Sequence, residues 1–189
     1  TARAFAFFAY PTYMSGNTVW VHNASEIDGV SGETILGKLA SGTEVPYNTM
    51  DMFSGLIPGS ISETSTICIL AGALLLILTK VGSWRIIVSG FAGAAVMALI
   101  FNSLPSLGIE GNDLTNFPWY NHLVIGGLAF GVVFMATDPV SAAQTMKGKW
   151  IYGFLIGFFA IMIRIFNPAY PEGIMLAILL MNVFAPVID

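Results

Sequence analysis

The chain has 189 residues, of which 56% are hydrophobic and only 10% are charged, and its mean hydropathy is +0.77. An ordinary soluble domain has about 25% charged residues, so this composition excludes a disordered chain, a nucleic-acid-binding protein and almost every soluble globular class. The single cysteine, Cys68, excludes an intrachain disulfide framework and a zinc or iron–sulfur site built from cysteines of this chain.

The first segment, residues 1–16, contains an apolar run at 4–13 that Pro11 interrupts. This run is about half of the roughly 20 apolar residues that a membrane-spanning helix needs. It predicts the end of a membrane helix whose beginning is missing, and therefore a chain that is a piece of a longer polypeptide. A short buried helix is the alternative.

Charged residues divide the chain after residue 58 into long apolar runs. No charge interrupts residues 64–79, 86–109, 114–137 or 173–188. Because backbone polar groups must be satisfied inside lipid, solidly apolar runs predict helices and not strands. We count five spans, at roughly 60–79, 86–104, 119–137, 150–166 and 172–188, so residues 59–189 predict a transmembrane helical bundle in an all-α integral membrane protein.

The basic residues predict how this bundle is oriented. Lys80 and Arg85 flank one joint between spans, and Lys147 and Lys149 lie in another that falls on the same side if the spans alternate. By the positive-inside rule this side, which also receives the C-terminal Asp189, is cytoplasmic. Residues 17–58 are then an extracytoplasmic loop.

Small residues recur four positions apart within the predicted spans. The pairs are Gly90 with Ala94, Gly127 with Gly131, and Gly153 with Gly157. Small residues at this spacing let helices approach closely, so these pairs predict close helix packing.

The extracytoplasmic loop contains a motif of chemical interest, Asp28-Gly29-Val30-Ser31-Gly32-Glu33-Thr34. It resembles the D-x-x-S-G-A-T/S signal at which a flavin transferase esterifies a Thr or Ser hydroxyl with FMN, with Glu33 where Ala is usual. Successive backbone N–H groups in a glycine-containing turn can receive phosphate oxygens. The resemblance implies that Thr34 is the attachment residue and that Asp28, Ser31 and Gly32 belong to the binding signal. A solvated loop is the alternative.

Further stretches along the chain resemble one family. They are RAFAFFAYP at 3–11, GSISETST at 59–66, FMATDPVS at 134–141 and NPAYPEG at 167–173 followed by the apolar C-terminal segment. Together they resemble the B subunit of the sodium-translocating NADH:quinone reductases, and the D subunit of the Rnf complex shares the same plan.

The resemblance implies a subunit of a redox-driven, sodium-pumping NADH:ubiquinone reductase in the bacterial inner membrane. It implies a covalent FMN, a noncovalent riboflavin, ubiquinone as electron acceptor, and other subunits of the complex as partners. It also implies a larger inverted-repeat fold similar to urea transporters, of which these residues are part.

Acids at the ends of the spans are the candidates for a sodium pathway, because sodium prefers oxygen ligands. The resemblance assigns Asp138 and Asp189 to sodium uptake from the cytoplasm. The alternatives are that Asp138 caps the next helix and that Asp189 is solvated. Glu63 is interpreted as a first-turn helix residue, and Arg164 with Glu172 as a structural pair across a joint.

Two other functions remain open. The first is an Rnf-type D subunit, which carries electrons between ferredoxin and NAD with the same flavin linkage. The second is a non-redox channel for a small polar solute on the same scaffold. Copurified subunits distinguish the first, and solute flux without bound flavin distinguishes the second.

Overall fold

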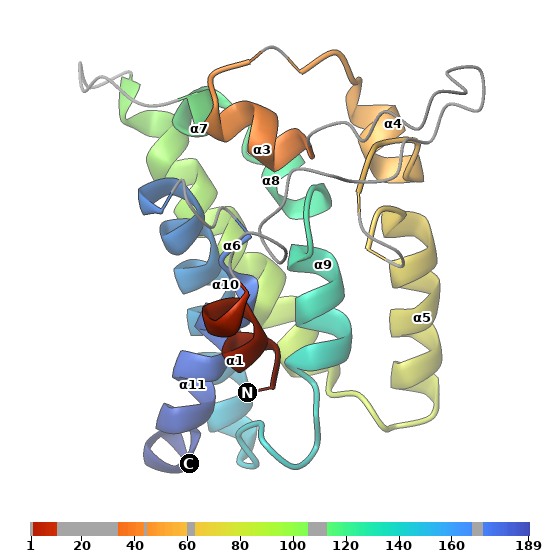
Figure 1. Cartoon of the computed structure of the whole chain (residues 1–189). Helices are drawn as coiled ribbons and strands as arrows, with labels where there is room; N and C mark the ends of the chain where they lie inside the picture. Colours follow the sequence, from red (N-terminus) through yellow and green to blue (C-terminus); the bar gives the residue numbers. More distant parts are fainter. Residues whose placement is uncertain (1, 11–33, 44, 60–62, 106–112, 168–171) are drawn as a thin grey trace.

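The computed structural model of the chain describes residues 2–10, 34–43, 45–59, 63–105, 113–167 and 172–189. Every regular element in these ranges is a helix, which confirms the all-α prediction (Figure 1). In chain order the elements are α1 (Ala2–Ala9), α3 (Ile35–Ala40), α4 (Thr49–Ser54), α5 (Thr66–Leu78), α6 (Trp84–Ser103), α7 (Asp113–Asn116), α8 (Asn121–Val124), α9 (Leu128–Phe130), the π-helix η2 (Gly131–Met135), α10 (Met146–Phe166) and α11 (Ile174–Ile188).

Among the described residues, two helices are long and apolar enough to cross a membrane. These are α6 with 20 residues and α10 with 21. The helices α5 and α11 are apolar but shorter, with 13 and 15 residues. Together with the composition, they fit a membrane protein, whereas the five-span count and the urea-transporter-like fold stay predictions.

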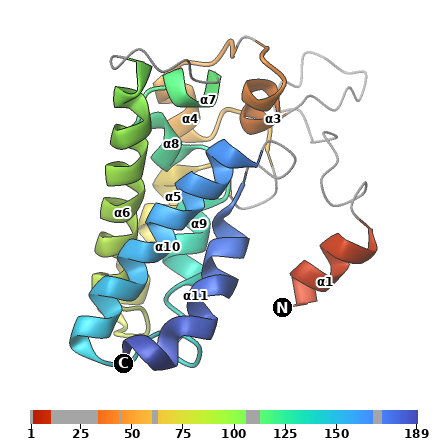
Figure 2. The same cartoon turned by 90° about the vertical axis from the view of Figure 1, so that its left-hand side faces the viewer.

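The two ends of the bundle differ. The short helices α3, α4 and α7 lie at one end, and the connectors 79–83 and 136–145 lie with the C-terminus at the other (Figure 1). The basic joints thus share one end of the molecule, as the alternation of spans predicts. The view turned by 90° shows that helix α1 stands apart from the bundle (Figure 2).

Glycines bring α6 and α10 into backbone contact. A Cβ added at Gly157 would lie 1.9 Å from the carbonyl oxygen of Gly90, and one added at Gly93 would lie 2.0 Å from the carbonyl oxygen of Phe154. At Gly153 the nearest atom would be Ser89 Oγ, at 2.1 Å. The close packing predicted from the pairs Gly90–Ala94 and Gly153–Gly157 is therefore confirmed, because no larger side chain fits between these helices.

The segment predicted as one span over 119–137 is broken into pieces. Helix α8 ends at Val124, Ile125 is extended with ψ of 149°, and Gly126 has a φ of +67° before α9 and η2 follow. Only glycine adopts such a φ without strain, so Gly126 ends one helical piece and allows the next to begin. The apolar run predicts one continuous span, and its length does not reveal this interruption.

Candidate functional site

Thr34, the predicted flavin-attachment residue, is the N-cap of α3. Its Oγ1 accepts the backbone N–H of Gly37 at 3.1 Å, and the residue is half-buried. The next turn buries Ile35, Leu36 and Leu39, which anchor α3 against the rest of the structure. The hydroxyl of Thr34 is therefore held at a fixed position, and the other predicted residues of the motif, Asp28, Ser31 and Gly32, lie outside the described residues.

Asp138 lies in the connector that follows η2. Its carboxylate accepts the hydroxyl of Ser141 at 2.7 Å and the backbone N–H groups of Ser141 and Val140 at 3.2 and 3.4 Å. The Ser141 hydroxyl, with help from these N–H groups, holds the pKa of Asp138 below its ordinary value. Asp138 is therefore an ionised carboxylate at neutral pH, and it stabilises its own turn and not the start of α10, which Thr145 caps.

Asp189 reaches the same connector from the end of α11. Its carboxylate accepts the backbone N–H groups of Gln144 and Thr145, each at 2.9 Å, and the hydroxyl of Thr145 at 3.1 Å. The N–H of Thr145, followed by that of Gln144, lowers the pKa of Asp189. Asp189 is exposed, yet it binds the N-terminal end of α10.

The structure thus brings the two predicted sodium-pathway residues to one connector, residues 136–145, at one end of the bundle. Within the described ranges, no group of three or more His, Cys, Asp or Glu side chains is arranged to hold a metal ion. Any cation that binds here would depend on the carboxylates of Asp138 and Asp189 together with backbone or hydroxyl oxygens.

A second polar region lies at the helix break, where the sequence predicts only a structural pair of Arg164 with Glu172. Arg164, in the last turn of α10, is fully buried, with 0% of its surface exposed. Its Nη1 donates to the carbonyl oxygen of His122 at 2.8 Å, and its Nη2 donates to that of Ile125 at 3.2 Å. Arg164 therefore satisfies carbonyl groups that the interruption between α8 and α9 removes from helical hydrogen bonding.

Two glutamates lie near this arginine. Glu63 Oε2 would be 2.9 Å from a Cβ added at Gly127, and Arg164 Nη2 would be 3.4 Å from one added at the adjacent Gly126. Both Glu63 and Glu172 act electrostatically on the guanidinium of Arg164. The predicted association of Arg164 with Glu172 therefore includes Glu63 as well.

The interpretation of Glu63 as a first-turn helix residue is wrong. Ser65 is the N-cap of α5, and its Oγ accepts the N–H of Cys68 at 3.4 Å, so Glu63 lies before the helix, which begins at Thr66. Its carboxylate lies against the α8–α9 break instead. The sequence could not show this, because the contact joins segments about 60 residues apart.

His122 is a further buried polar residue of this region. It is 2% exposed, its Nε2 donates to the carbonyl oxygen of Leu114 at 3.0 Å, and its ring packs edge-on against Phe117 at 5.4 Å. An ionisable residue within an apolar segment is by default a functional candidate. That rule, applied to Arg164 and His122, is the signal that could have located this region.

The whole chain matches one protein family, described as the NQR2, RnfD, RnfE family, over residues 1–189. It is 51% identical to the B subunit of the Na(+)-translocating NADH-quinone reductase of Chromohalobacter salexigens, over 100% of this chain and 45% of the relative. It is 50% identical to the proteins of the same name from Klebsiella pneumoniae, over 99% of this chain and 46% of the relative, and from Ectopseudomonas mendocina, over 100% and 46%.

The chain spans about half the length of these curated relatives. The family match over residues 1–189 includes the Thr34 segment and the two polar regions. The chain therefore belongs to the NQR2, RnfD, RnfE family.

Proposed function

We propose that the chain is part of the B subunit of a sodium-translocating NADH:quinone reductase, a redox-driven translocase of the bacterial inner membrane. The observation that carries this proposal is the identity of about 50%, over essentially the whole chain, to relatives that bear this name. Other subunits of the complex, ubiquinone and membrane lipid are the partners that the proposal includes.

Covalent FMN on Thr34 is the finer part of the proposal. FMN supplies one- and two-electron transfer, and the protein must hold it and tune it. Thr34 fits an attachment role because α3 fixes its position and because its Oγ1 accepts a hydrogen bond from the N–H of Gly37. An ester oxygen retains lone pairs, so the helix cap can survive esterification. Asp28, Ser31 and Gly32 complete the signal that a flavin transferase would read.

The sodium path forms the second part. Asp138 lies on the 136–145 connector and Asp189 contacts it from the end of α11, and both carboxylates remain ionised at neutral pH. We place this connector at the cytoplasmic face because Lys147, Lys149 and Arg85 lie at the same end of the bundle. The Thr34 end is then extracytoplasmic, which is where the transferase would act. A noncovalent riboflavin belongs to the same proposal without assigned residues.

The test uses the full-length subunit, expressed with its neighbouring subunits and the flavin transferase. We expect fluorescence of the subunit on a denaturing gel, its loss in Thr34→Val, and its retention in Thr34→Ser, which keeps a hydroxyl. Thr43→Val is the matched control, because Thr43 Oγ1 donates to the carbonyl of Lys38 close to the same helix but lies outside the motif.

Mass spectrometry of the peptide that spans residues 23–43 gives the decisive reading. A peptide with the added mass of an FMN phosphoester on Thr34 supports the assignment. An unmodified peptide from native membranes, or fluorescence that persists in Thr34→Val, contradicts it. The neighbouring subunits that copurify with the protein then distinguish a sodium-translocating NADH:quinone reductase from an Rnf complex.

A further inference from the structure

The first turn of α3 rests on the break between α8 and α9. Gly126 lies inside this break with a φ of +67°, and a Cβ added to it would lie 2.5 Å from Cδ1 and 3.6 Å from Cγ of Leu36. Leu36 is 3% exposed and follows Thr34 by two positions. Figures 1 and 2 agree that α3 lies at the end of the bundle that holds α8. The helix that Thr34 caps is therefore in contact with the break.

Arg164 holds the same break from the side of α10. Its Nη1 and Nη2 donate to the carbonyl oxygens of His122 and Ile125, and Nη2 would lie 3.4 Å from the Cβ added to Gly126. Leu36 and Arg164 thus reach Gly126 from two different helices. We call Leu36, Ile125, Gly126 and Arg164 the α3 seat.

Helix α3 depends on tertiary contacts for its position. It has six residues, whereas an isolated helix is marginal below about 12–15 residues. The buried side chains of Ile35, Leu36 and Leu39 hold it in place, and Leu36 makes the contact with Gly126. A functional group keeps its geometry when the residues that support it are locked by packing. The position of the Thr34 hydroxyl therefore follows the shape of the break.

We propose that Leu36 and Arg164 are positioning residues for the flavin on Thr34. This inference rests on the proposed function, because it needs FMN attached to that hydroxyl. Arg164 sets the shape of the break through two carbonyl groups, Gly126 leaves room for Leu36, and Leu36 passes this shape to the first turn of α3. The flavin is then placed relative to α10, and not only relative to its own loop.

The simpler alternative is that Leu36 is an ordinary core side chain and that Arg164 only closes the hydrogen bonds of the break. Substitutions at the α3 seat would then weaken the protein as other core substitutions do, with no preferential effect on α3 or on the flavin. Positioning predicts instead that residues far apart in the chain share one effect, on α3 and on the flavin that it carries.

The first measurement is hydrogen exchange of the full-length subunit in its complex. The backbone N–H of Lys38, which donates to the carbonyl oxygen of Thr34 at 2.9 Å, reports on α3. Leu36→Ala should raise its exchange rate on the order of tenfold or more, because burial of a leucine side chain contributes more free energy than a factor of ten represents. Arg164→Met loses both donations to the break and should raise the same rate.

Gly126→Ala tests the contact itself. In the wild-type background the new Cβ meets Leu36 Cδ1 at 2.5 Å, so α3 must move and its exchange becomes faster. Leu36→Ala removes both Cγ and Cδ1, so in that background Gly126→Ala should raise the rate by a smaller factor. The strain of alanine at this φ is present in both backgrounds, so the comparison isolates the contact. Equal factors in the two backgrounds contradict it.

The second measurement reports on the flavin. Its fluorescence anisotropy is taken as the difference between each complex and the same complex with Thr34→Val, which removes the attachment hydroxyl. The motif before Thr34 is unchanged in Leu36→Ala and Arg164→Met, so we expect both variants to keep FMN on the peptide of residues 23–43 but with lower anisotropy. Arg164→Lys keeps a donor and loses the planar fork, so its anisotropy should be intermediate.

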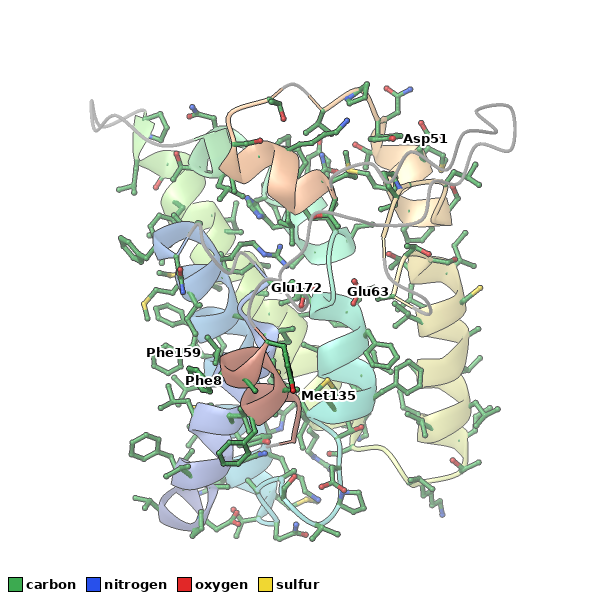
Figure 3. All side chains as sticks on the ribbon, viewed as in Figure 1. Phe8, Asp51, Glu63, Met135, Phe159 and Glu172 are labelled. Carbon is green, nitrogen blue, oxygen red and sulfur yellow. The ribbon has the colours of Figure 1, made fainter. Side chains whose placement is uncertain are left out.

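Met52→Ala is the matched control. Met52 is 2% exposed on α4, and Figure 3 marks this helix by Asp51, across the end of the bundle from α3. Truncation of a buried methionine costs core packing of a similar size to that of a buried leucine. We therefore expect lower thermal stability in Met52→Ala, with the exchange of α3 and the flavin anisotropy as in the wild type.

Unchanged exchange of α3 in both Leu36→Ala and Arg164→Met overturns the proposal, and so does faster exchange with unchanged flavin anisotropy. If Arg164→Met does not assemble, the paired Leu36 and Gly126 variants and the anisotropy of Leu36→Ala decide by the same criteria. A wild-type peptide of residues 23–43 that carries no FMN contradicts the proposed function instead, so the two failures are distinguishable.

Discussion

The substitution Gly157→Ala tests the contact on which the bundle is built. The added Cβ would lie 1.9 Å from the carbonyl oxygen of Gly90 and 2.7 Å from the backbone nitrogen of Ala94, both of them backbone atoms. Ordinary contact begins at 3.4 Å, so α6 and α10 would have to separate locally by about 1.5 Å. A flexible side chain could turn away, but a helix backbone cannot.

The expected cost arises from two opposing effects. Overpacking of a close contact costs about 1–3 kcal/mol, and the upper part of this range applies because both partners are backbone. Replacing Gly by Ala inside a helix recovers about 1 kcal/mol of helix propensity. We therefore expect a net destabilisation of about 2 kcal/mol, which lowers the Tm of a domain of this size by about 4–8 °C.

The assay is thermal unfolding of the detergent-solubilised protein, measured as loss of the monodisperse peak in size-exclusion chromatography. Gly72→Ala is the matched control, since the same substitution in α5 meets the ring tip of Phe134 at 2.6 Å. Phe134 is 38% exposed and its ring can move, so this variant should stay within about 1 kcal/mol of the wild type. Equal stability of the two variants would show that α6 and α10 are not in backbone contact.

Two further predictions concern polar contacts. Asp189→Asn should lower thermal stability at pH 7. Because hydrogen bonds from the N–H groups of Thr145 and Gln144 hold the folded pKa of Asp189 below its ordinary value of 3.8, the difference from wild type should shrink as the pH falls below 3.8 and be lost once the pH is below the folded pKa; a difference that does not shrink as the pH falls below 3.8 contradicts the carboxylate contacts. Asn102→Leu should destabilise the protein by about 1–3 kcal/mol, because Asn102 Nδ2 donates to the carbonyl oxygens of Thr115 and Phe117 at 2.9 and 3.0 Å. Denaturation of this variant beside Asn116→Leu, at an exposed position on α7, measures the effect, and equal stability contradicts it.

The sequence alone determined the class of the protein and the position of its apolar segments. Lipid supplies no hydrogen-bond partners, so long uncharged runs can only be helices, and α6, α10 and α11 appear close to their predicted ranges. Small residues four positions apart on α6 and α10 correctly predicted close packing, because that spacing places them on one helix face. The family resemblance, carried by short stretches along the chain, was confirmed by the match over residues 1–189.

Only the tertiary structure decided which polar groups gather at the helix break. Nothing local marks Glu63 as a neighbour of Gly127, or Arg164 as the donor to His122 and Ile125, because these contacts join segments far apart in the chain. Hydropathy averages over the length of a span, so a break of three residues between α8 and α9 leaves the average almost unchanged. The break exposes the carbonyl groups of His122 and Ile125, and the buried Arg164 donates to both of them. This arrangement requires α10 to lie beside the break.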